Sequence, residues 1–419
     1  MLLYVKSALV YPGKSFLERY FTAEICQGSV YMSSSKKIDP RSMKRLNKQL
    51  ILRHLIERGP RSRIELVAMT GLANSAIWRI TEELIQEGLI EQKGYFMRTN
   101  TKRASVYGPT KAFATSLIID VQVLQTTVAL GFLDGSWEII SSFPTNGFEE
   151  FLNNIDSIMN SKLFDERLRK GKTRMVFSLP GIVDGKNCTL LYAPNLKWHN
   201  VDFREHFARY GFEILIDNDS NLSLLGESFF AKDIKNSNNA FFFYLGEGVG
   251  GALLINSNIV KGSNFAAGEI GHSILMVKNT IFEVEELLSI SKLVSMFEQT
   301  TGENLEGSLK ERFDAIVRFW LAGDKTTHQL IDDFLKNLVI TIRNIGYFMN
   351  PEIIVFGGAV SNLWETFGSF IEKELLQIDI YGFLRNIKFR DTIFKSVSPS
   401  LPGCNITAIN KILEDMNNA

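Results

Sequence analysis

The charges of this 419-residue chain are divided unevenly along its length, and this division limits how the chain can be organised. Residues 41–111 contain 14 lysines and arginines against 6 aspartates and glutamates, whereas residues 112–419 contain 27 against 37. The first segment is therefore strongly basic and the second is acidic. A small basic segment joined to a large acidic one predicts a module that binds a polyanion on a body that does not.

The apolar pattern of the basic segment predicts three helices and then a hairpin. The second helix is expected to start at Ser62, with Glu65 at capping-box spacing, and to stop at Gly71. The third is expected to be capped by Asn74 and to end at Gly88, before two short strands with a basic tip. The first helix shows the spacing of an amphipathic helix in Leu46, Leu50, Ile51, Leu55 and Ile56. Residues 42–111 thus predict a winged helix-turn-helix.

Such a domain would place its third helix in the major groove of DNA. Ile77 and Ile80 should face the domain core, and Trp78 is left open between a core position and stacking on the DNA backbone. A plain solvated bundle is the alternative, but the charge excess, the caps and the hairpin agree with DNA binding. The DNA-binding candidates are Asn74, Ser75, Ala76, Trp78 and Arg79 on the helix and Lys93, Arg98, Lys102 and Arg103 on the wing.

The acidic body alternates strand and helix patterns, which predicts an α/β fold. It opens with residues 116–136, a strand that carries Asp120, a tight turn and a second strand that ends on Asp-Gly. We expect a first lobe at residues 112–238, a second at 239–404, and a C-terminal helix at 405–419 that packs back on the first lobe.

The order of short motifs along the body resembles the ROK family of sugar kinases and transcriptional repressors. The motifs are TGLANSAIWRI in the basic segment, then LPGIVD, APNLKW, IDNDSN, LGEGVGG, AAGEIGH and NPEIIVFGGAVS. The resemblance covers the chain from about Met43 to its end and is closest to the DNA-binding repressor branch. It implies a winged helix-turn-helix followed by a two-lobed, actin-like (RNase H-like) sugar-kinase fold, with a sugar cleft between the lobes.

The resemblance also implies which residues bind the sugar. In the kinases, the aspartate at the position of Asp219 takes the proton from the attacking hydroxyl. Paired amides and carboxylates on rigid elements suit a polyol, because they offer both donors and acceptors. The implied sugar-binding residues are Asn195, Asn218, Asp219, Glu269, His272 and Glu285.

Several departures from the family pattern argue against catalysis. Asp120 is followed by Val-Gln-Val-Leu instead of a glycine pair and threonine, and Glu247 stands where the kinases carry threonine. Both changes remove contacts to phosphate, and the second adds a like charge. The cysteine-rich zinc loop after His272 is absent, so Ile281 and Phe282 are expected to hold that loop by packing. The vestigial nucleotide-binding residues are Asp120, Gly246, Gly248, Gly250, Gly357 and Gly358.

The chain is therefore predicted to be a non-catalytic, sugar-responsive transcriptional regulator, most simply a repressor, with Asp219 as a vestigial base. We expect double-stranded operator DNA and a small sugar as partners, a homodimer or dimer of dimers, and neither zinc nor ATP as cofactor. An active sugar kinase with an appended DNA domain, and a DNA-binding scaffold controlled by a protein partner, remain as alternatives. Substitution of Glu269 or His272 would separate sensing from the scaffold.

The remaining features concern the compartment and the start of the chain. The three cysteines, Cys26, Cys188 and Cys404, are far apart and form no disulfide framework, which suits a reducing cytoplasm. No apolar run approaches the roughly 20 residues that span a bilayer, so no membrane partner is expected. Residues 1–41 are expected to be an N-terminal extension, either disordered or, for residues 1–31, the result of a misassigned translation start.

Overall fold

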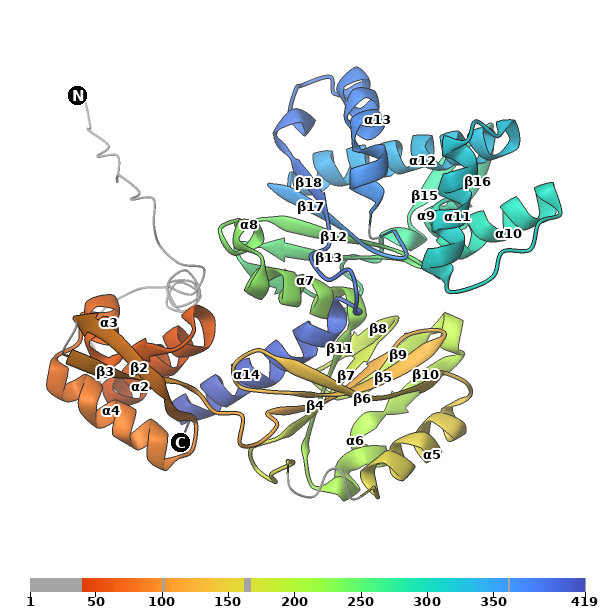
Figure 1. The fold of residues 1–419 in the computed structure, drawn as a ribbon. Helices are drawn as coiled ribbons and strands as arrows, with labels where there is room; N and C mark the ends of the chain where they lie inside the picture. Colours follow the sequence, from red (N-terminus) through yellow and green to blue (C-terminus); the bar gives the residue numbers. More distant parts are fainter. Residues whose placement is uncertain (1–39, 100–101, 162–166, 361, 419) are drawn as a thin grey trace, which may run out of the picture.

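A computed structural model of the chain describes residues 40–99, 102–161, 167–360 and 362–418. These residues form a small N-terminal domain, two larger α/β lobes, and a C-terminal helix that runs from the junction of the lobes to the N-terminal domain (Figure 1). The predicted extension falls mostly on residues 1–39, outside the described residues, and the first described helix begins at Pro40. No helix within the described ranges is both long and apolar enough to cross a membrane.

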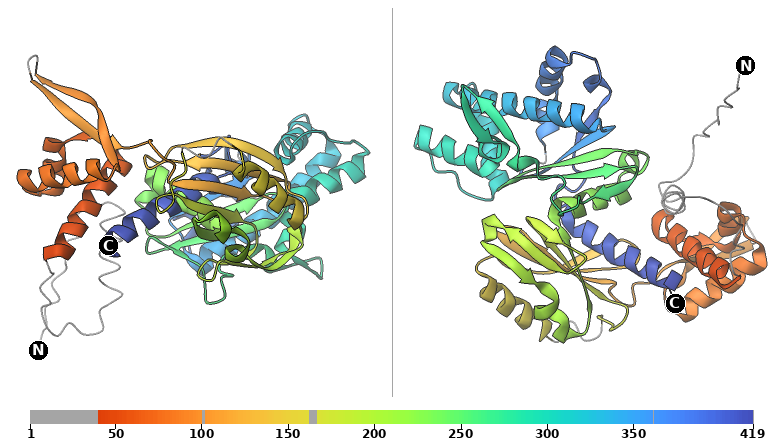
Figure 2. Two further views of the ribbon diagram at one scale, coloured as in Figure 1. Left: turned by 90° about the horizontal axis from the view of Figure 1, so that it is seen from below. Right: turned by 180° about the vertical axis from the view of Figure 1, so that it is seen from behind.

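The N-terminal domain packs three helices beside a three-stranded sheet of order β1-β3-β2. This arrangement confirms the predicted winged helix-turn-helix, although the strands of the hairpin are longer than expected. Figure 2 shows that the β2–β3 hairpin projects away from the two lobes. The elements are α2 (Pro40–Arg58), β1 (Arg61–Ser62), α3 (Arg63–Thr70), α4 (Asn74–Gln86), β2 (Ile90–Thr99) and β3 (Lys102–Pro109).

Local chemistry sets the helix boundaries in this domain. The predicted capping box is confirmed, because the Ser62 hydroxyl accepts from the Glu65 amide and the Glu65 carboxylate accepts from the Ser62 amide. Gly71 ends α3 at a φ of 69°, a conformation that only glycine adopts without strain. The predicted Asn74 cap is wrong, since extended Ala73 precedes the first turn of α4 and gives it no side-chain cap. Asn74 is already helical, and it is exposed.

The first lobe is built on a five-stranded sheet of order β11-β7-β4-β5-β6, in which β4, β7 and β11 run parallel. A second, three-stranded sheet of order β10-β9-β8 adds to this lobe, and the core of the lobe is rich in phenylalanine. The strands are β4 (Ser116–Val121), β5 (Gln125–Gly131), β6 (Trp137–Pro144), β7 (Arg174–Leu179), β8 (Ile182–Asp184), β9 (Thr189–Ala193), β10 (Trp198–Asp202) and β11 (Glu213–Asn218). The helices are α5 (Phe148–Met159), η1 (Pro194–Leu196), α6 (Phe203–Phe207) and η2 (Ala208–Tyr210).

The second lobe repeats this plan with the sheet order β14-β13-β12-β17-β18. Helices α7 (Asp219–Phe230) and α8 (Lys232–Lys235) lead into it, so the predicted boundary at residue 238 falls in the loop before β12. Its strands are β12 (Ala240–Leu245), β13 (Val249–Ile255), β14 (Asn258–Val260), β15 (Ile274–Val277), β16 (Thr280–Glu283), β17 (Ile353–Gly358) and β18 (Lys388–Asp391). Its helices are η3 (Ile270–His272), α9 (Val284–Leu288), α10 (Ile290–Thr301), α11 (Leu309–Leu321), α12 (Lys325–Met349), α13 (Leu363–Ile378) and η4 (Leu384–Asn386).

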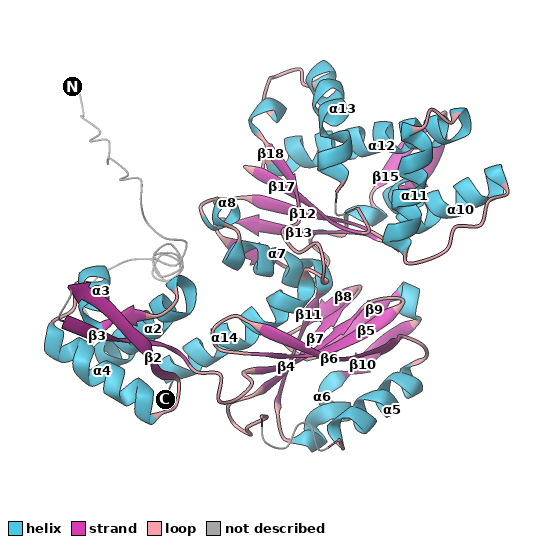
Figure 3. Ribbon diagram, viewed as in Figure 1, coloured by secondary structure: helices cyan, strands magenta, loops and turns pink. Residues whose placement is uncertain are grey.

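Both five-stranded sheets thus place three antiparallel strands beside two further parallel strands in the same spatial order. Figure 3 shows the two sheets, each with its own helices, facing one another across the centre of the body. This duplicated arrangement confirms the predicted actin-like, RNase H-like fold. It brings the carboxyl ends of β4, β7, β11 and β12 to the junction of the lobes, where ligands of α/β proteins commonly bind.

The C-terminal helix α14 (Ser400–Asn418) begins five residues before its predicted start and packs on β4 and β7 of the first lobe. Its side chain Asn405 is completely buried and donates to the carbonyls of Phe132 and Ser136, at 3.0 and 3.2 Å. The side-chain oxygen Oδ1 of Asn405 also accepts from the hydroxyls of Thr115 and Ser116, at 3.1 and 3.0 Å. These four hydrogen bonds fix α14 to the edge of the first lobe.

The second half of α14 belongs to the hydrophobic core of the DNA-binding domain. The amide of Gln49, on α2, donates to the carbonyl of Leu413 at 3.1 Å. Because this core contains residues from both ends of the chain, the domain cannot move against α14 without exposing apolar surface. The shared core includes Ile51, Leu52, Leu55, Ile77 and Ile80 from the domain and Ile406, Ile409, Ile412 and Leu413 from α14.

Candidate functional site

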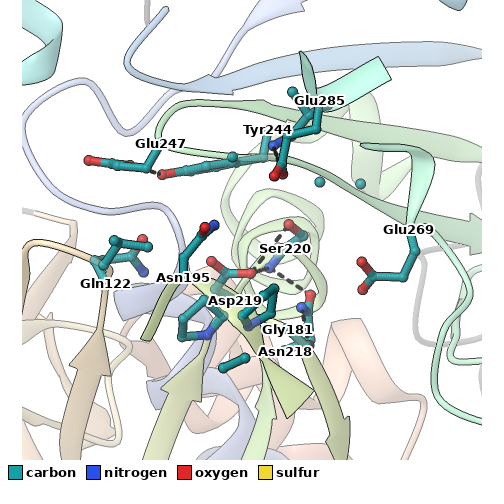
Figure 4. Close-up of a pocket in the computed structure, with 18 of the residues that line it drawn as sticks. Gln122, Gly181, Asn195, Asn218, Asp219, Ser220, Tyr244, Glu247, Glu269 and Glu285 are labelled. Atoms are coloured by element: carbon teal, nitrogen blue, oxygen red, sulfur yellow. Dashed lines mark hydrogen bonds between the residues drawn. The ribbon is translucent and has the colours of Figure 1, made fainter. Parts of the chain in front are cut away.

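A cleft of about 660 Å³, part of it open to solvent, lies between the two lobes. It is lined by loops that follow β4, β7, β11 and β12 and by residues near η3 and α9. The predicted sugar-binding residues, drawn from four separate stretches of sequence, all lie in its wall, as do Gln122, Gly181, Ser220, Tyr244 and Glu247 (Figure 4). The structure therefore brings the candidates Asn195, Asn218, Asp219, Glu269, His272 and Glu285 together in one place.

Asn218 and Asp219 lie where β11 ends and α7 begins. The side-chain oxygen Oδ1 of Asn218 caps α7 by accepting from the backbone amides of Ser220 and Asn221, at 2.9 and 3.1 Å. The side-chain nitrogen Nδ2 of Asn218 donates to the backbone carbonyl of Gly181 at 2.9 Å. The cap thus fixes the Asn218 side chain, while Asp219 faces the cleft.

The carboxyl group of Asp219 is strongly perturbed. Burial raises its pKa to about 7, and the nearby charges of Asp120 and Glu269 act in the same direction. A hydrogen bond from the Ser220 amide, at 2.7 Å, opposes the shift. Near neutral pH, Asp219 can therefore either donate a hydrogen bond to a sugar hydroxyl or accept one from it.

Glu269 and Glu285 reach into the cleft from the side of the second lobe (Figure 4). Burial and the neighbouring Glu285 raise the pKa of Glu269, although His272 opposes this shift. One oxygen of Glu285 accepts from the amide of Val249 at 3.0 Å, which anchors the glutamate beside the Gly246–Gly248 turn. These two carboxylates provide acceptors for hydroxyl groups, and that of Glu285 is held in place.

His272 has a carboxylate partner of its own. Its Nδ1 lies 3.0 Å from the carboxylate of Glu283, and this hydrogen bond raises the pKa of the imidazole. The partner leaves Nε2 to face other groups. Glu283 comes from β16, the second strand of the hairpin that follows η3, and sequence reasoning missed it because no motif singles it out.

The zinc site that the family resemblance implies does not fit the residues at this place. No cysteine lies between His272 and Glu285, and no cluster of three or more His, Cys, Asp or Glu side chains in the described chain is placed to hold a metal. The β15–β16 hairpin occupies the region instead. The predicted anchor Ile281 is wrong, because its side chain is 60% exposed, while Leu275 and Val284 are buried in the core of the second lobe.

One side of the cleft is lined by Gln122, Tyr244 and Glu247. The Tyr244 hydroxyl donates to the Glu247 carboxylate at 3.0 Å, and the ring lies against Gly246. Asp120 is buried and accepts hydrogen bonds from Ser400, at 2.6 Å, and from Gln122, at 3.1 Å. Asp120 is therefore held by the start of α14, an interaction that the sequence did not suggest.

The glycines predicted as remnants of a nucleotide site have close neighbours within the protein. A Cβ at Gly248 would lie 2.7 Å from the Glu285 carboxylate, and one at Gly250 would lie 3.0 Å from the Ser220 hydroxyl. Gly357 and Gly358 end β17, and a Cβ at Gly358 would lie 2.3 Å from the carbonyl of Leu245. Close packing between strands and loops thus explains these glycines without a nucleotide.

The second candidate site is the start of α4. Asn74, Ser75, Trp78 and Arg79 are exposed there, Ala76 is half-buried, and Ile77 and Ile80 are buried as predicted. Trp78 is 57% exposed, which settles its position outside the core, and the guanidinium of Arg63 lies 5.2 Å from its ring centre. An exposed face of polar, aromatic and cationic residues can contact both bases and phosphates.

The predicted wing residues lie along the β2–β3 hairpin. Lys93 is near its base, in a bulge between two ladder pairs, and its ammonium group pairs with Glu91 at 2.5 Å. The backbone register places Arg98, Lys102 and Arg103 near the tip, and their side chains lie outside the described residues.

The fold and the two sites define a protein with a DNA-binding domain and a sugar-kinase-like body. Residues 118–379 match the ROK family, and residues 45–91 match the winged helix-turn-helix DNA-binding family. Because the first match covers more than half of the chain, this protein belongs to the ROK family.

Proteins similar to this chain include both repressors and kinases. The xylose repressor of Caldicellulosiruptor bescii is 24% identical over 398 residues, which cover 88% of this chain and 97% of the repressor. The glucokinase of Halalkalibacterium halodurans is 25% identical over 272 residues, which cover 59% of this chain and 82% of the kinase. A solved ROK family transcriptional regulator, a homologue of the E. coli MLC protein, shares the fold with a TM-score of 0.69 at 19% identity, over 90% of this chain and 99% of that one.

Proposed function

We propose that this protein is a sugar-responsive transcriptional repressor of genes for carbohydrate uptake or catabolism. The similarity to a xylose repressor extends over 88% of this chain, compared with 59% for the glucokinase, and this difference favours the repressor function. A pentose such as xylose is accordingly the first effector to test. In this function, the kinase-like body binds the sugar without transferring phosphate to it.

The observation that carries the proposal is the path of α14 between the two sites. Ser400, at its first turn, donates to Asp120, a buried residue that also accepts from the cleft residue Gln122. Asp120 lies close enough to Asp219 to raise the pKa of that residue. The last turns of α14 share the core of the DNA-binding domain. A single continuous helix thus connects a buried neighbour of the cleft to the core of the DNA-binding domain, as an element that couples the two sites must.

Sugar binding would act by closing the lobes on each other. Asn195 and Asn218 reach the sugar from the first lobe and its junction with α7, and Glu269, His272 and Glu285 reach it from the second lobe. A ligand that contacts both lobes favours the closed state by its differential affinity for that state. The closing movement is passed through Asp120 and α14 to the DNA-binding domain, where about 1–3 kcal/mol of coupling is enough to change gene expression.

On DNA, a homodimer or a dimer of dimers would place two α4 helices in successive major grooves. A palindromic operator with half-sites about 34 Å apart, or a multiple of this distance, follows from such a dimer. Closure of the lobes changes the spacing of the two α4 helices, so that they no longer fit both half-sites. The same movement with the opposite sign would produce activation by sugar.

The same residues argue that the cleft has no cofactor, neither zinc nor ATP. Glu247 and Gln122 lie where a kinase would need phosphate-binding groups, and a carboxylate repels a triphosphate. Phosphoryl transfer depends on positioning and neutralising charge, so Asp219 without those groups would act as a hydroxyl partner and not as a base.

The proposal is tested by sequencing genomic DNA fragments that the purified full-length chain retains near physiological salt, with and without a panel of sugars. We expect a few palindromic sites beside carbohydrate genes, lost or weakened with one sugar of the panel. Retention of DNA at the salt-sensitive, sequence-independent level alone would contradict the proposal.

An active sugar kinase is the second candidate, favoured by the raised pKa of Asp219, which suits a general base near neutral pH. Release of ADP that depends on sugar and disappears in Asp219→Asn would establish this activity. The repressor function predicts no such release.

A further inference from the structure

The described residues that line the cleft are rich in carboxyl groups and contain no lysine or arginine. Four carboxyl groups and one imidazole are the ionisable side chains that a small ligand would meet there, apart from the Tyr244 phenol. The imidazole is itself paired with Glu283. The carboxyl groups are those of Asp219, Glu247, Glu269 and Glu285.

The cleft already disfavours further negative charge. Burial raises the pKa values of Asp219 and Glu269, and neighbouring carboxylates add to both shifts. Burial and the charge of Glu247 also hold the pKa of the Tyr244 phenol well above its usual range. Groups on both lobes thus show the same preference for an uncharged state.

Four of the backbone amides that could bind a phosphate in such a cleft are already used. The first amides of α7, those of Ser220 and Asn221, donate to the Asn218 side chain. In the turn after β12, the Val249 amide donates to Glu285, and the Gly246 amide donates to the carbonyl of Gly248 at 2.9 Å. A helix start or glycine turn binds an anion through its unpaired amides, and these amides are paired.

We infer that the effector is an uncharged sugar, without phosphate or carboxylate groups, and that the cleft rejects the phosphorylated form of the same sugar. The inference rests on the proposed sensing function and specifies its ligand. A neutral polyol can donate its hydroxyl protons to carboxylates on both lobes. A phosphate or carboxylate group would instead be buried beside like charges, and His272, the cationic group among the described lining residues, is already paired with Glu283.

Glu247 is the residue that this inference assigns to specificity. Its carboxylate is oriented by the Tyr244 hydroxyl and lies near Gln122, on the side of the cleft opposite Asn218 (Figure 4). A phosphate ester formed on a hydroxyl beside Asp219 would extend toward this side, where a kinase holds the group it transfers. Replacing the Glu247 carboxylate by a neutral amide should change the affinity for a dianion bound beside it by about tenfold. The affinity for a neutral sugar should change much less, because the sugar carries no charge.

The test uses the full-length chain and its operator, with sugars in matched pairs of neutral and charged forms. The probes are xylose, glucose and N-acetylglucosamine, with xylose 5-phosphate, glucose 6-phosphate, glucuronate and N-acetylglucosamine 6-phosphate. Affinity is measured by calorimetry, and release of operator DNA is measured by fluorescence anisotropy. We expect one neutral sugar to bind and its charged counterparts to bind at least about 100-fold more weakly.

Tighter binding of a charged form than of its neutral parent would overturn the inference, whereas release of the operator by that form would leave the proposed function intact. Binding of a neutral sugar without any effect on operator affinity would overturn the proposed function alone. In Glu247→Gln, the ratio of the affinity for the neutral sugar to that for its charged counterpart should fall by about tenfold. The control Glu149→Gln removes an equal charge from the exposed start of α5 and should leave discrimination unchanged.

Discussion

Replacing Ser400 by alanine should uncouple the cleft from the DNA-binding domain. Ser400 is buried, and its hydroxyl donates to the Asp120 carboxylate at 2.6 Å. A hydrogen bond to a charged group contributes roughly 1.5–3 kcal/mol, which is as large as a typical allosteric coupling energy. Without it, Asp120 keeps the hydrogen bond from Gln122 but loses its link to α14.

The expected result is a loss of response with both binding activities retained. Ser400 is not among the residues that line the cleft, so the sugar dissociation constant should change by less than about threefold. The change in operator affinity caused by saturating sugar should fall by about tenfold or more, following the energy of the lost hydrogen bond. Operator affinity is measured by fluorescence anisotropy, with and without the sugar.

A matched control comes from the same helix. The Thr407 hydroxyl donates within α14 to the carbonyl of Gly403 at 3.0 Å, so Thr407→Ala removes a hydroxyl from the helix without breaking its link to the cleft. This variant should respond to sugar as the unmodified chain does. If Ser400→Ala keeps the full response while folded and able to bind sugar, the assignment of α14 as the coupling element is refuted.

Three further substitutions probe the cleft and the DNA-binding domain. In the folded chain the pKa of Asp219 is about 7, above its usual value, so the folded state retains a proton that the unfolded state releases near pH 4. The free energy of unfolding of the unmodified chain should therefore fall as the pH rises from about 4 to about 7. The Tm of Asp219→Asn, taken relative to that of the unmodified chain, should increase from pH 5 to pH 8. Parallel curves of Tm against pH for the two proteins would contradict the raised pKa. Glu283→Gln should lower the pKa of His272, measured by NMR titration of the imidazole, and weaken sugar binding severalfold, whereas an unchanged titration would exclude the carboxylate as its partner. Arg79→Ala should weaken operator binding by about 1–3 kcal/mol in an anisotropy titration and leave calorimetric sugar binding unchanged; equal loss of both would indicate misfolding instead.

The parts of the fold that the sequence predicted are those written in local patterns. The capping box of Ser62 and Glu65, the left-handed stop at Gly71 and the period of apolar residues in α2 each depend on neighbours a few positions apart. The motif order predicted that the sugar-binding residues share one cleft, and they line one cleft in the structure, with Asn218 and Asp219 at the end of β11.

The errors and omissions share a different physical origin. The cap at Asn74 was wrong because the backbone conformation of Ala73, and not the preference of asparagine, decides where α4 begins. The links from Ser400 to Asp120 and from Asn405 to the first lobe join residues almost 300 positions apart. No periodicity or spacing records such contacts, because they arise only when α14 packs on the folded lobes. Glu283 was missed because no motif includes it and because it meets His272 only when the β15–β16 hairpin folds back.

The most direct test of coupling between the cleft and the DNA-binding domain is a pair of sugar titrations by calorimetry, one on the free protein and one on the protein saturated with operator. Thermodynamic linkage requires the operator to change sugar affinity by the same factor by which sugar changes operator affinity. For a repressor released by its sugar, we predict that the operator complex binds the sugar about 5–150-fold more weakly than the free protein does. Equal sugar affinity in the two titrations would show that the cleft and the DNA-binding domain are not coupled.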